Sequence, residues 1–505
     1  MQKDTKKLKI LSILWPILST IIILLGATLI YLYSNGYRFN FSNQEFKRTG
    51  VISVESEPFL ADMYINDKKI GITPKSNSLE VGTYNTSVEK SGYVTWNKQL
   101  NVVEGKITPV FPFLILSEIQ GESVWESKLE YVKNWSSIDK NVYIILTRDN
   151  AKYALWSYRV NTSILDFSTN PIQILTPTTE DITIIPSYNG DKAILVVSSK
   201  AYLIDTKKSN TLSSSNILNI TNPNKYTITW AEDNKKLILE NDSEIYAYNI
   251  DKNTAIKVLT KTKGTKYVWN TDKEGYLYLV TEIKEEDLEN VYIYKISQLT
   301  INGTVTSKDL IEKIYLLKSD EYIKQYRESG IPTSQFNNSP VCTQTAGEIT
   351  TIDINQDSEG IFIKTTLASY WYFANEKKYQ MVATYPSELI AYSPDSNKFI
   401  HKNEMGFFIF TLDKEKEDHT VDIGSKKINN IDSSITNDIR WLSDSIHLYY
   451  KENNTIYFAD IDGDNKTKLA EEENTVGYTL ENSRNYLKTI TYNDTGIQIT
   501  KYKIH

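Results

Sequence analysis

Histidine and cysteine, two residue types that often act in catalysis, are scarce in this chain. Its 505 residues include four histidines, and no two of them have the spacing of metal ligands: His401, His419, His447 and His505. A serine hydrolase needs a histidine base and an oxyanion hole, and the chain has no Gly-x-Ser-x-Gly elbow. Glycine-rich phosphate loops are absent as well. We therefore expect no enzyme, no cofactor, and no catalytic or metal-binding residue.

One acidic segment has the residue types of a cation site. Residues 460–465 read Asp-Ile-Asp-Gly-Asp-Asn, and Glu471 is the twelfth residue counted from Asp460. A calcium-binding EF-hand loop has its glycine at the sixth position, whereas Gly463 is the fourth. Because the segment also falls between two strand-like runs, we expect a hairpin turn. Paired carboxylates for glycoside chemistry cannot be selected from 63 acidic residues by sequence alone.

Composition narrows the class of protein. The single cysteine, Cys342, excludes an intrachain disulfide and a zinc site built from cysteine pairs. The net charge is −7 and no basic cluster follows the extreme N-terminus, so we expect no nucleic-acid partner. The 35 tyrosines favour strands, where aromatic side chains pack well on a pleated surface.

The N-terminus predicts a membrane anchor. Residues 10–33 are almost entirely apolar, and about 24 helical residues span about 36 Å, enough to cross a hydrocarbon core. Lys3, Lys6, Lys7 and Lys9 precede this run, so residues 1–9 should stay in the cytoplasm and the bulk should lie outside. A cleaved signal peptide is the alternative, but its apolar run is shorter. A linker over 34–48 should follow.

Residues 49–117 resemble the PEGA domain, a small extracytoplasmic β-module. The landmarks that match its pattern are Pro58, Ala61, Tyr64-Ile65-Asn66, Gly71-Ile72-Thr73-Pro74, Gly82-Thr83-Tyr84, Gly92-Tyr93 and Trp96. Two features depart from it: Glu57-Pro58-Phe59-Leu60-Ala61 replaces the tetrapeptide that names the family, and Asp67 replaces a turn glycine. The resemblance implies a noncatalytic surface or wall-associated module. We expect Tyr93 and Trp96 to be core residues.

A repeat organises the remaining chain, residues 118–505. In its clearest copies an aromatic residue is followed by Asp three positions on and by an apolar residue at the seventh: 230–237, 392–399 and 441–448. Further copies begin at Ser187, Ile354 and Leu480, and Trp135 with Asp139 and Trp269 with Asp272 mark two more. Repeats of about 40–50 residues with several short strands predict a β-propeller. We expect eight blades, with seven as the alternative, and Trp230 and Trp441 buried between blades.

The repeat resembles the propeller of the TolB-like family, with residues 392–398, Tyr-Ser-Pro-Asp-Ser-Asn-Lys, as the nearest copy of its signature. That resemblance implies the fold strongly and function weakly. An insertion over about 307–330 is expected to be helical, because Leu310, Ile314 and Leu317 recur at helical spacing. The last blade shows only three strand-like segments, so we expect residues 119–125 to add its fourth strand.

These expectations together describe a mainly β, single-pass membrane protein of the cell envelope. We expect it to bind a wall polymer or a surface protein through the propeller face, without catalysis. The alternative is a propeller-type carbohydrate-active enzyme. A convergent pair of channel-facing carboxylates with raised pKa values would favour that enzyme, and a lining of Tyr and Asn would favour binding. The binding residues and the ligand are not predicted.

Overall fold

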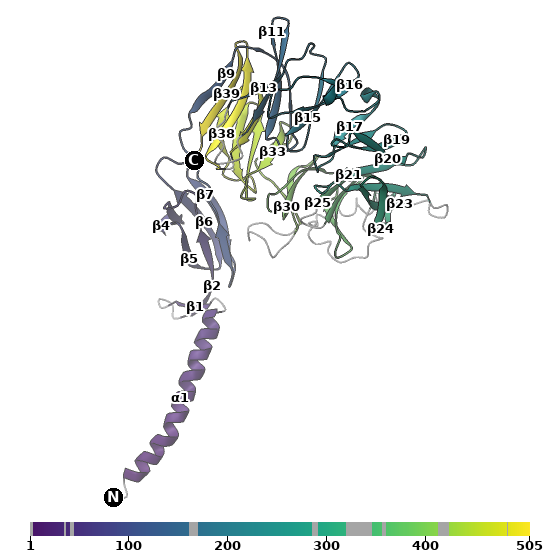
Figure 1. Cartoon of the computed structure of the whole chain (residues 1–505). Coiled ribbons are helices and arrows are strands. Elements are labelled where there is room, and N and C mark those ends of the chain that lie inside the picture. Colours follow the sequence, from purple (N-terminus) through teal and green to yellow (C-terminus); the bar gives the residue numbers. More distant parts are fainter. Residues whose placement is uncertain are drawn as a thin grey trace. The chain divides into compact units, whose positions relative to one another are not determined.

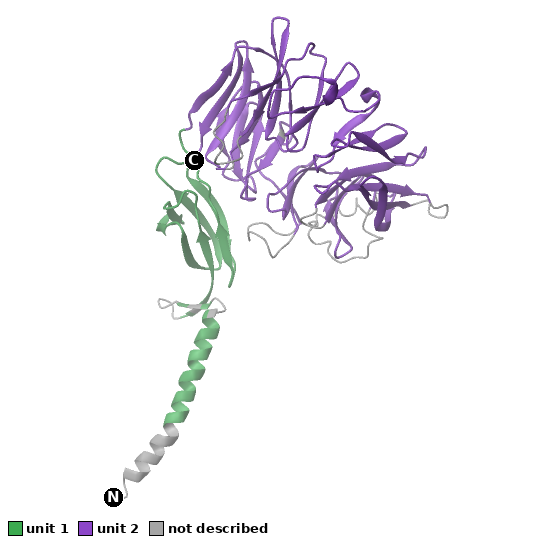
Figure 2. Ribbon diagram, in the orientation of Figure 1, with its two compact units in different colours: residues 1–118, 417–421 green, residues 119–416, 422–505 purple. Residues whose placement is uncertain are grey.

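The structure is a computed structural model. It describes residues 4–34, 37–40, 45–160, 170–284, 291–319, 346–355, 360–412, 424–481 and 483–505. The described residues up to 118 form one compact unit and those from 119 onward form another (Figure 2). The predicted helical insertion falls partly, and Cys342 and His419 fall entirely, outside the described residues.

The first unit begins with the helix α1, Asp4–Ser34 (Figure 1). Its stretch Trp15–Tyr33 has a mean hydropathy of 2.0, and none of that stretch is buried within the protein. The hydroxyls of Ser19 and Thr20 both donate to the carbonyl oxygen of Pro16 at 2.8 Å, so these polar groups are satisfied within the helix. The helix is therefore long and apolar enough to cross a membrane.

Two sheets follow α1. In the first, β2 pairs with β1, with β5 and, in parallel, with β8; in the second the order is β4-β3-β6-β7. Their bounds are β1 Tyr37–Asn40, β2 Glu45–Val54, β3 Asp62–Ile65, β4 Lys68–Ile72, β5 Lys75–Glu80, β6 Gly82–Glu89, β7 Trp96–Val102 and β8 Ile107–Val110. One apolar core contains Ile52, Met63, Val88 and Trp96, and Tyr93 packs against it. The expectation that Tyr93 and Trp96 are core residues is confirmed.

The second unit contains eight antiparallel sheets in its described part, which confirms the propeller and its eight blades rather than seven. Blade 1 contains β10 Glu130–Ser136, β11 Val142–Asp149, β12 Lys152–Arg159 and β13 Ile172–Leu175, and blade 2 contains β14 Thr183–Pro186, β15 Lys192–Val197 and β16 Lys200–Asp205. Blade 3 contains β17 Thr227–Trp230, β18 Lys236–Glu240, β19 Glu244–Asn249 and β20 Thr254–Thr260. Blade 4 contains β21 Tyr267–Thr271, β22 Leu277–Ile283, β23 Val291–Ile301 and β24 Val305–Leu317. Two short 3-10 helices, η1 Ser214–Asn216 and η2 Pro223–Lys225, lie between blades 2 and 3.

Blades 5–8 continue the pattern. Blade 5 contains β25 Ile349–Asn355, β26 Gly360–Thr365, β27 Ser369–Phe373 and β28 Lys378–Ala383, and blade 6 contains β29 Glu388–Tyr392, β30 Lys398–Asn403, β31 Gly406–Thr411 and β32 Gly424–Lys427. Blade 7 contains β33 Thr436–Trp441, β34 His447–Glu452, β35 Thr455–Asp460 and β36 Thr467–Glu471. Blade 8 contains β37 Thr475–Leu480, β38 Tyr486–Asn493 and β39 Gly496–Lys503, and β9 Gly121–Ser127 completes it.

The N-terminal strand of the second unit closes the ring. Strand β9 pairs antiparallel with β39, from Ile497 opposite Ser127 to Tyr502 opposite Gly121. The chain that precedes blade 1 thus supplies the fourth strand of blade 8, as predicted from residues 119–125. Blades 8 and 1 also share an apolar cluster, in which the ring of Tyr131 stacks on that of Tyr492 at 4.2 Å.

The repeated Asp has a structural role in the turn between the first two strands of a blade. Its side-chain oxygen accepts the backbone N–H two residues on: Asp139 from Asn141, Asn189 from Asp191, Asp233 from Lys235, Asp272 from Glu274, Asp395 from Asn397 and Asp444 from Ile446, all at 2.9–3.1 Å. Side-chain acceptors of this kind stabilise tight turns. The strongest sequence signal in the chain is therefore a folding signal.

The predicted repeat register is correct in five blades. Trp230, Ile354, Tyr392, Trp441 and Leu480 each pair with the residue seven positions on. In blade 2 the first strand ends at Pro186, so Ile194 pairs with Ile185 and Ser187 begins the turn instead. In blades 1 and 4 the spacing between the paired residues is longer than seven, because Trp135 pairs with Ile144 and Trp269 pairs with Leu279.

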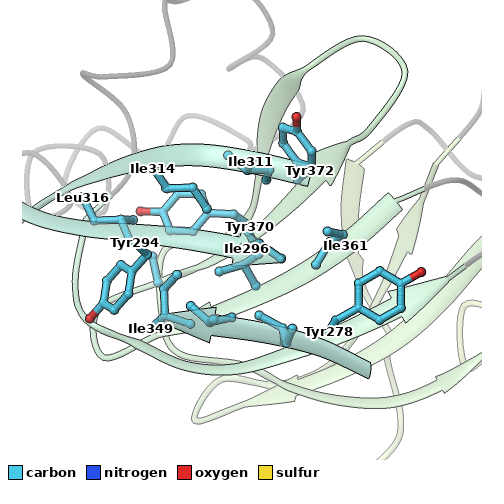
Figure 3. Close-up of a cluster of buried hydrophobic side chains, with 14 of the residues drawn as sticks. Tyr278, Tyr294, Ile296, Ile311, Ile314, Leu316, Ile349, Ile361, Tyr370 and Tyr372 are labelled. Atoms are coloured by element: carbon cyan, nitrogen blue, oxygen red, sulfur yellow. The ribbon is translucent and has the colours of Figure 1, made fainter. Parts of the chain in front are cut away.

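Blades pack through their sheet faces. Figure 3 shows the contact between blades 4 and 5, where Tyr278, Tyr294 and Ile296 meet Ile361 and Tyr370. Trp230 is 2% exposed, so the prediction that it is buried is confirmed, whereas Trp441 is only half-buried.

The expectation of a helix in the insertion is wrong where the structure describes it. Residues Val305–Leu317 form β24, the partner of β23. Along this pair Tyr294 lies opposite Ile314 and Ile296 opposite Ile311, so β24 contains an extra residue. Such a bulge lengthens the apolar spacing from two residues to three, which imitates a helical period. The acidic segment 460–465 does form the turn between β35 and β36, as predicted.

Candidate functional site

The first strands of the blades line the inside of the ring. Strand β10 contacts β14, β14 contacts β17, β21 contacts β25, and β29 contacts β33. Side chains bridge some of these neighbours: the Trp230 indole donates to the carbonyl oxygen of Ile185 at 2.8 Å, and the Asn270 amide donates to that of Ile352 at 3.0 Å. We call these first strands and the turns that follow them the inner ring.

A cluster of five polar side chains lies on the inner ring of blades 2–6. It comprises Tyr188 after β14, Glu232 after β17, Asn270 in β21, Asp353 in β25 and Tyr392 in β29, and we call it the inner-ring cluster. Asn270 Nδ2 donates to Asp353 Oδ2 at 3.2 Å, which orients that carboxylate. All five residues are half-buried, and the hydroxyl oxygen of Tyr392 is itself fully buried.

The two carboxyl groups of this cluster have raised pKa values. Burial, followed by the negative charge of Asp353, raises the pKa of Glu232 to about 7, and Lys273 partly opposes this. Burial raises the pKa of Asp353 to about 6, against the lowering effect of Tyr392 and Asn270. Burial and the nearby carboxylates also raise the pKa of the Tyr188 and Tyr392 hydroxyls, which therefore stay protonated at neutral pH.

The cluster is suited to hydrogen bonding with an uncharged ligand. Near neutral pH both carboxyl groups exchange between an accepting and a donating form, the tyrosines donate or accept, and the amide does both.

A second polar cluster joins blades 7, 8 and 1. The Arg440 guanidinium forms an ion pair with Asp438, donates to the carbonyl oxygen of Tyr478 at 2.5 Å, and lies over the Tyr478 ring at 4.2 Å from its centroid. It also donates to the Tyr143 hydroxyl at 3.4 Å. Since one side chain contacts three blades, this cluster holds the ring together where its two ends meet.

The three histidines that the structure describes lie apart from the inner-ring cluster. His401 is fully buried in β30, its Nε2 lies 2.9 Å from Ser425 Oγ, and burial lowers its pKa to about 3. His447 pairs with the turn residue Asp444 at 2.8 Å, and His505 lies near Asn485. Among the described residues no group of three or more potential metal ligands is found.

Sequence reasoning did not identify the inner-ring cluster, although the repeat contains a signal for part of it. Asp353 stands one residue before a repeat start, where other blades have Thr229 and Ala391. A carboxylate at that position is an exception to the pattern of the blades. Glu232 is an exception of the same kind, because it lies two residues after a repeat start, where two other blades have Pro394 and Ser443.

Comparison with known proteins identifies one domain. Residues 49–112 match the family model of the PEGA domain, which agrees with the resemblance of the landmarks to that family. No curated protein sequence matches the chain.

Several solved structures are similar to about three quarters of the chain. An oligogalacturonate lyase in complex with manganese is 8% identical, with a TM-score of 0.37 and coverage of 75% of this chain and 98% of that chain. The WD40 domain of SCAP from fission yeast is 10% identical, with a TM-score of 0.38 and coverage of 76% and 98%. A eukaryotic initiation factor is 11% identical, with a TM-score of 0.40 and coverage of 76% and 89%. The propeller assignment rests on the sheets of the chain itself.

Proposed function

We propose that this protein is a membrane-anchored binding protein of the cell envelope, whose propeller engages an uncharged polysaccharide of the wall without cleaving it. The inner-ring cluster is the observation on which this proposal rests. Its hydroxyl, amide and carboxyl groups converge from blades 2–6 and match the hydroxyl and amide groups of a neutral glycan. The PEGA domain at residues 49–112 suits an extracytoplasmic protein of this kind.

Anchoring follows from α1. With the N-terminal lysines in the cytoplasm, the PEGA domain and the propeller lie on the outer side of the membrane, where wall polymers are found. A tether of this kind raises the local concentration of both binding units at the membrane surface.

The second candidate is a carbohydrate-active enzyme that uses Glu232 and Asp353. The raised pKa of each carboxyl group favours it, because raised pKa values mark many catalytic acids. The hydrogen bond from Asn270 to Asp353 and the two tyrosine hydroxyls beside these carboxyl groups favour binding, because they surround the acids with hydrogen-bonding groups suited to a polyhydroxylated ligand.

Sedimentation with insoluble β-1,4-linked N-acetylglucosamine polymer tests both candidates. For binding we expect the full-length protein to sediment with the polymer and the number of reducing ends to stay constant. The variant Asp353→Asn should sediment at least tenfold less, while Glu274→Gln, an exposed change in the neighbouring turn, should behave as wild type. A rise in reducing ends that Glu232→Gln abolishes would establish the enzyme instead. Failure of the wild-type protein to sediment would contradict the proposal.

A further inference from the structure

A groove lies over strands β6 and β7 of the PEGA domain. It has a volume of about 370 Å³ and is lined by Asp67, Asn85, Thr86, Ser87, Asn97, Lys98 and Gln99. Its size falls within the range of small-molecule sites, roughly 300–1,000 Å³. All seven lining residues belong to the PEGA domain, whereas the inner-ring cluster belongs to the propeller.

The strand register explains why polar side chains gather in this groove. Asn85 of β6 lies opposite Gln99 of β7, and Ser87 lies opposite Asn97. In both strands these residues are more exposed than the neighbours Val88 and Leu100, which face the core. Opposed residues share one face of a sheet, so the three amide side chains and the hydroxyl line a single surface.

The hairpin turn at one end of the groove is held in place. Asn66 and Asp67 both have positive φ, 46° and 63°, as a two-residue hairpin turn requires. The Asn66 backbone N–H donates to the carbonyl oxygen of Asn85 at 2.8 Å, and the Asn85 N–H donates to Asn66 Oδ1 at 3.0 Å. These two bonds fix the turn that bears Asp67 against β6, so that the end of the groove is preorganised.

The chemistry of the lining selects a neutral, polyhydroxylated ligand. On the exposed face of the sheet, three amides and the Ser87 hydroxyl offer both donors and acceptors. Thr86 and Lys98 pair with each other on the opposite face, where the Thr86 hydroxyl is buried, and the groove has no excess of positive charge. A phosphate-rich polymer would require an excess of cations, and a lipid would require apolar walls. Tyr64 lies directly opposite Ser87, so an aromatic ring borders the groove on the same face.

We propose that this groove is a second saccharide-binding site, which takes a short segment of a neutral oligosaccharide. It shares its ligand chemistry with the proposed function but does not depend on the inner-ring cluster. Two sites on one chain would allow the protein to hold a polymer at two points, which raises the overall affinity without any new contact.

Isothermal titration calorimetry of the full-length protein in detergent, with the tetramer of β-1,4-linked N-acetylglucosamine, tests this proposal. We expect the double variant Asn85→Ala, Gln99→Ala to lose the groove site, with at least a tenfold weaker association there. The matched control is Thr83→Ala, Asn101→Ala, an exposed pair at another position of the same two strands, whose side chains bond to each other at 2.7 Å. This control should bind as wild type, and both double variants should keep the wild-type melting temperature.

The inner-ring variant Asp353→Asn separates the two proposals. Binding that the groove variant weakens and Asp353→Asn leaves intact would support the groove and contradict the proposed function of the propeller. The reverse pattern would overturn the groove and support the propeller site. Additive losses would support both sites, and no binding by the wild-type protein would overturn both.

Discussion

The indole Nε1 of Trp230 lies 2.8 Å from the carbonyl oxygen of Ile185 and donates a hydrogen bond to it, so that the first strand of blade 3 is tied to the first strand of blade 2. The same contact recurs between blades 7 and 6, where Trp441 donates to the carbonyl oxygen of Ala391 at 3.2 Å. The aromatic residue of the repeat thus fastens each of these blades to the preceding one.

The first prediction concerns this contact. Because Trp230 is almost fully buried, Trp230→Ala should lower the free energy of unfolding by about 3–5 kcal/mol. Trp230→Phe keeps most of the apolar contact and loses the hydrogen bond, so it should cost less. Chemical denaturation of both variants measures the difference. The half-buried Trp441 is the comparison, and a larger loss for Trp441→Ala than for Trp230→Ala would contradict the explanation by burial.

A second prediction follows from the raised pKa of Glu232. The pKa is about 7 in the folded protein and near 4.5 when unfolded, so the folded state binds more protons between these values. Stability is therefore lost as pH rises from about 4.5 to 7. Glu232→Gln removes this loss and should be more stable than wild type at pH 8, by about 1–2 kcal/mol after allowance for partial exposure. Melting temperatures at pH 8 and pH 4 test this, and an equal gain at both would contradict it.

A third prediction concerns His401, which is buried in its neutral form. Its pKa is about 3 in the folded protein and near 6.5 when unfolded, so the unfolded state binds the proton between these values. The stability that neutral His401 contributes to the folded state is complete above pH 6.5. Below pH 6.5 the free energy of unfolding falls by about 1.4 kcal/mol per pH unit. The variant His401→Gln can still form a hydrogen bond with Ser425. In chemical denaturation measured from pH 7 to pH 4, its free energy of unfolding should fall less steeply with decreasing pH than that of the wild type. An unchanged slope would show that other groups control acid stability.

Topology provides a fourth prediction. Four lysines precede the apolar stretch of α1, so the short N-terminal tail should stay in the cytoplasm. Protease added to intact cells with a permeable wall should digest residues 49–505 and spare the tail. The control is lysed cells, in which both parts should be cut. If residues 49–505 were protected until the cytoplasmic membrane is broken, the predicted orientation would be wrong.

The fold was largely predictable because its signal is local. In six blades the repeated Asp, or Asn189 in blade 2, accepts a backbone N–H two residues away, so the residues that stabilise the turn lie next to each other in the sequence. The inner-ring cluster was not predictable in the same way. Glu232 and Asp353 belong to different blades, and burial in the folded ring raises the pKa of both, with a further contribution to Glu232 from the charge of Asp353. The strand β24 was mistaken for a helix because its bulge changes the apolar spacing that the interpretation relied on.

The last prediction concerns ring closure by β9. Strand β39 is paired with β38 on one side and with β9 on the other, so a chain that starts after Ser127 would leave a long strand edge open. We expect that chain to melt at a lower temperature and to aggregate more readily than one that starts at Ser117.

A single substitution provides a sharper test of closure. A Cβ added at Gly496 would lie 1.8 Å from the backbone oxygen of Ser127 in β9, so Gly496→Ala must displace one of the two strands. Gly406→Ala is the matched control: its φ of +127° is close to the +134° of Gly496, and the atom nearest to the added Cβ is Cε of Lys427 at 3.3 Å, the far end of a flexible side chain. Both changes include a similar backbone cost of a side chain at positive φ, and only Gly496→Ala adds a clash with backbone. Closure through β9 therefore predicts a clearly lower melting temperature for Gly496→Ala than for Gly406→Ala, and equal losses would count against it.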